Sequence, residues 1–201
     1  MKIGIMGGTF DPVHNGHLAL AECACREYLL DQVWFMPNGH PPHKDNNKIV
    51  STPEQRAQMV SLAIRGHERF RLEDYELKQQ KVCCSYETME HFKKARPNDT
   101  FYFIIGADSL FSIEQWVHVE RLFPTCTVLA AFRDDKSSRS VMRSRMRLLR
   151  GKYQADIRLL TMPPVDVSSH ELRRMLMEHA DVSAYLPEAV EAYIRENRLY
   201  A

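Results

Sequence analysis

Residues 1–17 read Met1-Lys2-Ile3-Gly4-Ile5-Met6-Gly7-Gly8-Thr9-Phe10-Asp11-Pro12-Val13-His14-Asn15-Gly16-His17, and this stretch decides the fold. The apolar run from Ile3 to Met6 ends on a glycine pair, which is typical of a buried strand that stops at a turn. Apolar residues recur at helical spacing from Leu18 onward, so we expect a helix to begin near Asn15 or Gly16. A strand, a tight glycine loop and a helix therefore open the chain.

The loop between this strand and this helix has the features of a phosphate site. Gly7 and Gly8 permit backbone conformations and a close approach that side chains would block. The helix is expected to direct unpaired N–H groups and the positive end of its dipole at the loop. His14 and His17 are expected to face the same point. For either histidine alone a helix cap or a surface position is the simpler interpretation, but the pair favours the phosphate site.

Composition indicates one domain without a strongly charged partner. A length of 201 residues is enough for a sizeable core, and we expect a single domain over residues 1–201. The 27 basic and 26 acidic residues nearly cancel, so charge gives no reason to expect nucleic acid or a membrane as partner. Gly7-Gly8 interrupts the first apolar run too early for a signal peptide, and no apolar run reaches membrane-spanning length. Five poorly placed cysteines favour free thiols and a cytoplasmic location.

The rest of the chain predicts a parallel sheet. A strand over 33–36 completes a β-α-β unit with a right-handed crossover. Further strands are expected over 70–72, 75–77, 101–105, 127–132 and 157–162. Helices are expected to begin at 53, to follow the stretch 83–89 and run through residue 92, to span 138–150, to begin at 168 and to span 187–200. This alternation predicts an α/β doubly wound, Rossmann-like sheet. Ligands of such sheets gather at the carboxyl ends of the strands, so the loop 37–44 and the loop after residue 105 should join the first loop.

The motif Gly-Gly-Thr-Phe-Asp-Pro-x-His-x-Gly-His at 7–17 resembles the signature of nucleotidylyltransferases, in the form found in bacterial nicotinate mononucleotide adenylyltransferases. The resemblance extends through Pro-Pro-His-Lys at 41–44, Gly-Ala-Asp-Ser at 106–109 and Val-Ser-Ser-His-Glu-Leu-Arg at 167–173. It implies the nucleotidylyltransferase fold, with a helical part at about 165–201 that completes the ATP site. It also implies adenylyl transfer from ATP to nicotinate mononucleotide, giving deamido-NAD and pyrophosphate in NAD biosynthesis. Mg²⁺ is implied as a substrate-bound ion, with no metal site on the protein.

The resemblance assigns roles to residues of each motif. The catalytic residues it implies are His14, His17, Lys44 and Arg173. The ATP-binding residues it implies are Gly7, Gly8, Thr9, Phe10, Gly16, Gly106, Asp108, Arg133, Ser168 and Ser169. The mononucleotide-binding residues it implies are Asn38, His43, Lys44, Ser85, Thr88, Trp116 and Val117.

The stretch Cys83–Met89 departs from the family pattern Thr/Ser-Tyr-Thr-x-x-Thr, since cysteines replace its first two residues. Matching the final threonine to Thr88 places Ser85 where the family's hydroxyl faces the nicotinate carboxylate. A shifted match places Glu87 there, where two carboxylates would repel each other, so we favour the first match. Structural roles are the ordinary alternatives for three residues: a helix cap for Ser85 and Asp108, and core packing for Trp116.

Other activities stay open from the sequence. Pantetheine-phosphate adenylyltransferases and cytidylyltransferases share the fold, but neither explains Pro-Pro-His-Lys, the stretch 85–88 and Trp116 together. A metal hydrolase would need four histidines to converge, namely His14, His17, His40 and His43. A nucleotide sensor would bind ATP without releasing pyrophosphate. A homo-oligomer is compatible with the sequence.

Overall fold

The structure is a computed structural model that describes residues 1–39, 49–133, 136–162 and 167–200. In these residues six parallel strands form one sheet, in the order β3-β2-β1-β4-β5-β6. The strands are β1 (Lys2–Gly8), β2 (Gln32–Pro37), β3 (Phe70–Leu72), β4 (Thr100–Ile105), β5 (Thr127–Arg133) and β6 (Ile157–Met162). The expected doubly wound parallel sheet is therefore confirmed.

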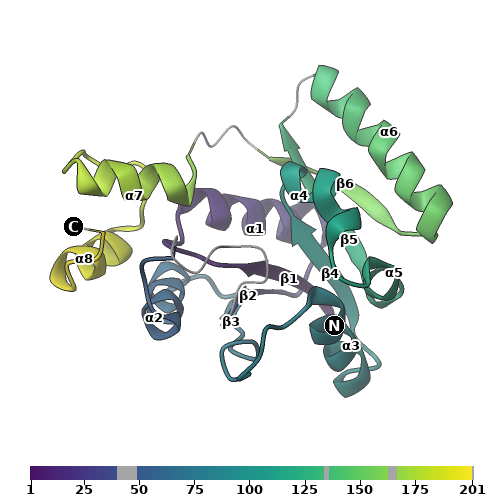
Figure 1. The fold of residues 1–201 in the computed structure, drawn as a ribbon, viewed down its shortest axis with the longest axis horizontal. Helices are drawn as coiled ribbons and strands as arrows, with labels where there is room; N and C mark the ends of the chain where they lie inside the picture. The colour runs from purple at the N-terminus through teal and green to yellow at the C-terminus, as the bar shows by residue number, and fades with distance from the viewer. Residues whose placement is uncertain (40–48, 134–135, 163–166, 201) are drawn as a thin grey trace.

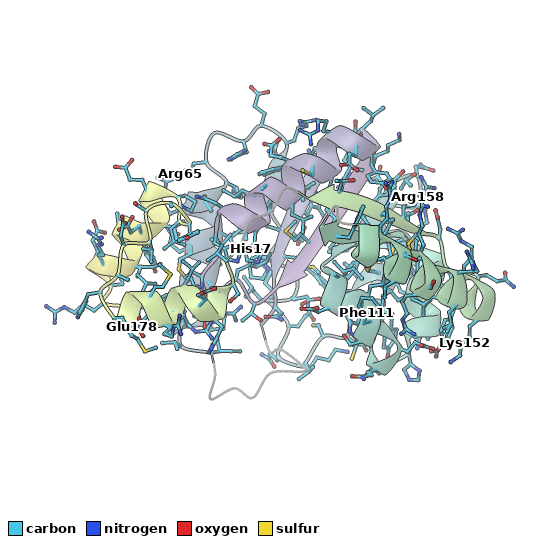
Figure 2. The ribbon with its side chains drawn as sticks, turned by 90° about the horizontal axis from the view of Figure 1, so that it is seen from above. His17, Arg65, Phe111, Lys152, Arg158 and Glu178 are labelled. Atoms are coloured by element: carbon cyan, nitrogen blue, oxygen red, sulfur yellow. The ribbon has the colours of Figure 1, made fainter. Side chains whose placement is uncertain are left out.

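Helices cover both faces of the sheet (Figure 1). One face carries α1 (Asn15–Tyr28), α2 (Pro53–Ala63), α7 (Ser169–Met177) and α8 (Glu188–Glu196). The other face carries α3 (Ser85–Ala95), α4 (Ala107–Ser112), α5 (Val119–Leu122) and α6 (Lys136–Tyr153), with short 3-10 turns η2 (Ile113–Gln115) and η3 (Phe123–Thr125). Figure 2 shows that the molecule is elongated, with Glu178 after α7 at one end and Lys152 of α6 near the other.

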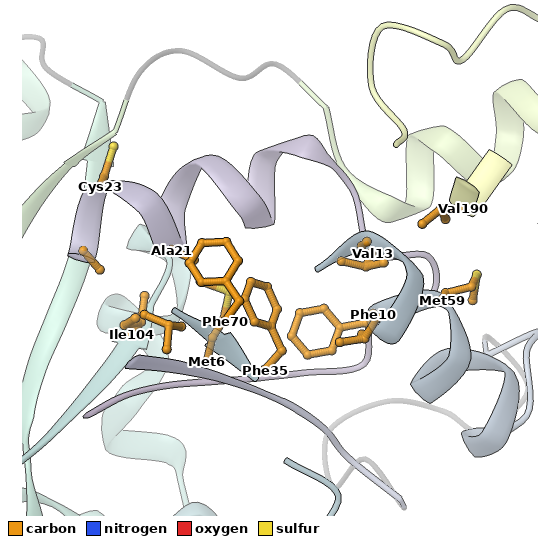
Figure 3. Packing of buried hydrophobic residues seen from close by; sticks show 14 of the residues in the cluster. Met6, Phe10, Val13, Ala21, Cys23, Phe35, Met59, Phe70, Ile104 and Val190 are labelled. Carbon is orange, nitrogen blue, oxygen red and sulfur yellow. The ribbon is translucent and has the colours of Figure 1, made fainter. Parts of the chain in front are cut away.

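Side chains of each strand alternate between the two helical layers. In β1, Ile5 packs into the layer of α3 to α6, whereas Met6 packs into the layer of α1, α2, α7 and α8. Within the second layer Phe70, Phe35 and Phe10 follow one another (Figure 3), with ring centroids 5.2 and 5.9 Å apart. Burial of this aromatic row holds the loop after β1 against the sheet, because Phe10 belongs to that loop.

The chain changes its direction of winding between β1 and β4. From β1 the sheet grows to β2 and β3, and from β4 it grows to β5 and β6. The helix that follows β1 therefore covers one face, and the helix that follows β4 covers the other. Loops at the carboxyl ends of two such strands diverge and leave a crevice between them. The fold places the candidate site at this crevice.

Two local expectations were wrong. Residues 75–77 form a turn instead of a strand, because Glu76 is drawn into the interior and accepts a hydrogen bond from Thr88 at 2.8 Å. The first strand also continues through Gly7 and Gly8, neither of which has a positive φ. The glycine pair thus presents its backbone to the crevice as the end of a strand, and not as a tight turn.

One buried arginine joins the loop after β1 to the loop after β2. Arg56 of α2 is 1% exposed. Its guanidinium donates to the carbonyl oxygens of Thr9 at 2.8 Å, Asn38 at 2.7 Å and Gly39 at 3.4 Å, and to Asn38 Oδ1 at 3.4 Å. Burial lowers the pKa of Arg56 from its ordinary value, with Asp11 opposing. The sequence predicted only a structural helix here, and this clamp between two loops of the site was missed.

We predict that Arg56→Lys lowers the free energy of unfolding by about 2–4 kcal/mol. A lysine ammonium cannot reproduce the guanidinium fork, and each buried carbonyl left unpaired costs roughly 1–3 kcal/mol. Urea unfolding measures the effect. Arg65→Lys, at an exposed position shortly after α2, is the control and should change stability by less than about 0.5 kcal/mol. Equal losses in the two variants would contradict the clamp.

Candidate active site

A cavity of about 360 Å³ lies at the carboxyl ends of β1, β2 and β4. His17, which lines it, lies in the middle of the molecule between the C-terminal helices and α6 (Figure 2). The structure brings eight of the predicted site residues onto its wall: Gly7, Gly8, His17, Asn38, Ser85, Gly106, Trp116 and Val117. A Cβ on Gly106 would meet nothing within 4 Å, so this position leaves open space at the end of β4.

The two histidines form a reciprocal cap at the start of α1. His14 Nδ1 accepts from the backbone N–H of Gly16 at 3.1 Å, and His17 Nδ1 accepts from the backbone N–H of His14 at 3.2 Å. The ring centroids are 3.8 Å apart. Because each Nδ1 accepts a hydrogen bond, the proton of each neutral ring sits on Nε2. The capping alternative for His14 is therefore correct as a contact, and it orients the ring so that Nε2–H is its donor.

Burial keeps the His14 ring uncharged. It lowers the pKa of His14 from 6.5 to about 4, so the ring is neutral near pH 7 in the ligand-free protein. His17 is less buried and meets the edge of the Phe10 ring at a centroid distance of 5.0 Å. The pair thus carries its ring protons on Nε2, without a fixed positive charge on His14.

The first N–H groups of α1 are not unpaired, which corrects the sequence-based expectation. Asn15 donates to the carbonyl of Tyr185 at 2.8 Å, Gly16 donates to His14 Nδ1, and His17 donates to the carbonyl of His14 at 2.9 Å. These N–H groups are therefore paired with acceptors of His14 and of Tyr185 in the C-terminal segment. An anion at this helix would meet side chains and the helix dipole instead of free backbone N–H groups.

Trp116 gives the cavity an aromatic part of its wall. Trp116 is half-buried and packs edge-to-face against Phe103, with centroids 6.0 Å apart, so it is both a core residue and part of the wall. Ser85 is the first residue of α3, and Cys84 is the N-cap, so the capping alternative for Ser85 was wrong. Glu87 binds Lys81 at 2.9 Å and does not line the cavity. This geometry supports the match that places Ser85 at the contact position.

Thr88 lies behind the cavity wall and not on it. Its side chain is fully buried, and its hydroxyl donates to Glu76, which does line the cavity. Burial raises the pKa of Glu76 from 4.5 to about 7, while the hydrogen bond from Thr88 opposes this rise. Sequence reasoning missed Glu76, and the available signal was an acidic residue between two apolar ones, Tyr75 and Leu77.

The N-terminus of α7 docks on the loop after β1. Ser168 caps the helix by accepting from the N–H of Glu171 at 3.1 Å. Ser169 donates to the carbonyl of Pro12 at 2.9 Å. Arg173 Nη1 donates to the carbonyl of Asp11 at 2.6 Å and lies 3.9 Å from its carboxylate. The predicted ATP-site residues of α7 thus lie against the loop after β1, residues 9–14, which we call the histidine loop. The hydroxyls of Ser168 and Ser169 already take part in structural hydrogen bonds.

Asp11 is a third residue whose role the sequence did not predict, after Arg56 and Glu76. It is 2% exposed, and its carboxylate accepts from the N–H groups of Val50 at 3.0 Å and Ser51 at 3.3 Å and from the Tyr200 hydroxyl at 2.7 Å. Helix α8 ends at Glu196, short of the expected residue 200, and Tyr200 has a φ of 62°. The chain end leaves the helix and reaches the loop after β1.

Several predicted site residues lie elsewhere. Thr9 and Phe10 are buried within the loop after β1, and Gly16 is buried in α1. Asp108 is exposed in the first turn of α4, whose N-cap is Gly106, so the capping alternative for Asp108 was wrong. Arg133 ends β5, and its side chain is outside the described part. His40, His43 and Lys44 lie outside the described residues.

The described residues also bear on metals, thiols and membranes. Within them, no group of three or more His, Cys, Asp or Glu side chains converges as a metal site. All five cysteines are described, and all are free, as expected. No described helix is long and apolar enough to cross a membrane.

Comparison with known proteins adds relatives by sequence. Residues 5–175 match the cytidylyltransferase-like family model. A probable nicotinate-nucleotide adenylyltransferase from Lachnoclostridium phytofermentans is 38% identical over 99% of this chain and 98% of its own. A protein of the same name from Clostridium botulinum (strain Okra) is 36% identical over 98% of this chain and 97% of its own.

Solved structures share the fold. The nicotinic acid mononucleotide adenylyltransferase of Plasmodium falciparum complexed with NaAD has a TM-score of 0.79 at 21% identity, covering 99% of this chain and 97% of that one. The same enzyme complexed with APC has a TM-score of 0.77 at 21% identity, covering 99% and 96%. The chain belongs to the cytidylyltransferase-like family and, within it, to the nicotinate-nucleotide adenylyltransferases.

Proposed function

We propose that this chain transfers the adenylyl group of ATP to nicotinate mononucleotide, giving deamido-NAD and pyrophosphate in NAD biosynthesis. One cavity is lined by the end of β1, by the His17 imidazole and by Trp116 together with Ser85, and this observation carries the proposal. The names of the relatives agree with this reaction, and a protein of the same fold has been solved with NaAD. The test is release of pyrophosphate from ATP that depends on added nicotinate mononucleotide.

The reaction needs alignment and charge stabilisation more than proton transfer. The phosphate oxygen of the mononucleotide is already anionic, so neither a general base nor a covalent protein intermediate is required. Nε2–H of His14 and His17 would donate to oxygens of the α-phosphate as negative charge grows there. Their Nδ1 contacts hold both rings in place before the substrates arrive, which reduces reorganisation in the transition state.

The leaving pyrophosphate would lie toward the start of α7. Arg173 is 15% exposed and next to the histidine loop, so its remaining N–H groups suit phosphate oxygens. We propose that Lys44 offsets charge between the substrates. Mg²⁺, which neutralises phosphate charge when bound with ATP, fits this donor set: Mg²⁺ keeps water and phosphate ligands and needs few protein carboxylates.

The pyridine ring would stack on Trp116, with its carboxylate near Ser85 and Val117. Asn38 accepts from Arg56 through Oδ1, which leaves its amide N–H groups as the donors it offers to the ligand. The free thiols support a cytoplasmic location, which we also propose. A homo-oligomer stays a hypothesis, and light scattering of the purified chain would test it.

We predict that His17→Ala lowers kcat by roughly 10²–10³ while the circular dichroism spectrum is retained, because one donor to the developing charge is lost. Steady-state pyrophosphate release measures kcat. His179→Ala, at an exposed position after α7, is the control and should retain turnover. Near-normal turnover of a folded His17→Ala enzyme would contradict the role.

We predict that Arg173→Lys lowers kcat/KM for ATP roughly tenfold or more, with a smaller effect for the mononucleotide. An ammonium cannot contact a phosphate and the Asp11 carbonyl with the geometry of a guanidinium. Arg174→Lys, the exposed neighbour on α7, is the matched control. Equal losses for both substrates would indicate that Arg173 acts through the loop structure alone.

We predict that the acid is a better acceptor than the amide, nicotinamide mononucleotide, and that Ser85→Ala reduces this preference roughly ten- to a hundredfold. A hydrogen bond to a charged group is worth about 1.5–3 kcal/mol, and the hydroxyl would donate to the carboxylate. Ser85→Thr keeps the hydroxyl with a stiffer rotamer and should retain or increase the preference. The measurement is kcat/KM for each mononucleotide at saturating ATP. Equal kcat/KM values of the wild type for the two mononucleotides would contradict nicotinate mononucleotide as the preferred acceptor.

A further inference from the structure

A carboxyl group forms part of the wall at the pyridine end of the cavity. Glu76 is 7% exposed and lines the cavity together with Cys83, Ser85 and Trp116. Its Oε1 accepts from the Thr88 hydroxyl at 2.8 Å, and in the described part of the chain no cation pairs with it. A buried carboxyl beside the place of the substrate's own carboxylate has a direct effect on which substrate can bind.

The carboxyl is held in place from two sides. A Cβ on Gly39 would lie 2.7 Å from the Glu76 carbonyl oxygen, so the turn 74–79 packs directly against the loop after β2. That loop is clamped by Arg56 through the Gly39 carbonyl. On the other side, Thr88 belongs to the first turns of α3. The side chain is therefore part of a packed wall and not of a surface turn.

Three titratable neighbours of Glu76, namely Tyr75, Cys83 and Cys84, stay uncharged near neutral pH. Tyr75 is on the same turn, and burial raises its pKa. The thiols of Cys83 and Cys84 precede α3, and burial raises both pKa values, that of Cys83 to about 11. Among the described residues of the remaining elements, the charged or titratable groups are the Lys81–Glu87 ion pair, His17 on α1 and Arg56 behind Gly39.

We propose that Glu76 sets the preference between nicotinate and nicotinamide mononucleotide: protonated, it donates a hydrogen bond to the nicotinate carboxylate, and ionised, it repels that carboxylate and accepts from the amide N–H of nicotinamide. This inference rests on the proposed function, because it concerns the acceptor of the same reaction. No covalent step is involved, and binding of the acid above neutral pH takes up one proton at Glu76.

The direction of the pH effect follows from that proton. Burial raises the pKa of Glu76 to about 7, so the donating form is present below pH 7 and is lost above it. The ratio of kcat/KM for the acid to kcat/KM for the amide therefore falls as pH rises. Both mononucleotides carry the same 5′-phosphate and use the same ATP, so ionisation of phosphates cancels in the ratio.

The experiment measures this ratio from pH 6.0 to 8.5 for the full-length wild type, Glu76→Gln and Glu87→Gln, by pyrophosphate release at saturating ATP. Glutamine keeps the shape and can still accept from Thr88, so the fold is retained, which circular dichroism checks. Glu87→Gln is the control, because this carboxylate is near the start of α3 and binds Lys81 outside the cavity.

We expect the wild-type ratio to fall roughly tenfold or more between pH 6.5 and 8.5, because a carboxyl group with a pKa of about 7 loses most of its proton over this range. The Glu87→Gln enzyme should follow the wild type, and the Glu76→Gln ratio should be flat. A flat wild-type ratio, or the same slope in Glu76→Gln, overturns the inference and leaves adenylyl transfer intact. Absence of turnover with either mononucleotide overturns the proposed function, and this inference with it.

Discussion

The carboxylate of Asp11 is the contact on which the arrangement of the site depends. It lies in the loop after β1 and is almost completely buried, so its removal from water must be offset by hydrogen bonds. Its donors are the N–H groups of Val50 and Ser51, which precede α2, and the hydroxyl of Tyr200 near the chain end. Ser51 also donates to Tyr200 at 2.7 Å, which closes the network. One side chain therefore ties three segments together.

These contacts explain how residues far apart in sequence reach one crevice. Arg173 donates to the backbone carbonyl of Asp11, so α7 is positioned by the same residue that holds Tyr200. On the other side of the loop, Arg56 donates to the carbonyl of Thr9 and to Asn38 after β2. Breaking either arginine contact would leave buried carbonyls unpaired, which costs more than the net value of the bond itself. The histidine loop is thus fixed from both ends before any substrate binds.

The fold could be predicted from the sequence because its signals are local. Apolar runs such as 101–105 and caps such as Thr52 depend on neighbours in the chain, and the corresponding elements were found. The roles of Asp11, Arg56 and Glu76 could not be predicted, since each depends on partners 12 to 189 residues away. The prediction of unpaired N–H groups at the start of α1 was wrong for the same kind of reason. The N–H of Asn15 donates to the carbonyl of Tyr185, a residue that only folding brings near. Sequence motifs therefore predicted where the site lies, whereas the hydrogen bonds that orient its side chains depend on long-range contacts.

In several side chains of the site, one polar atom makes a structural hydrogen bond and another polar atom does not take part in that bond. In His14 and His17, Nδ1 accepts from the backbone, so the ring proton sits on Nε2. In Asn38, the side-chain oxygen accepts from Arg56. Because the backbone N–H groups at the start of α1 are already paired, the proposed recognition of the charged substrates relies on side chains. Side chains titrate and backbone amides do not. A site built in this way therefore depends on the protonation of groups such as His14 and Glu76, whose pKa values burial has moved in opposite directions.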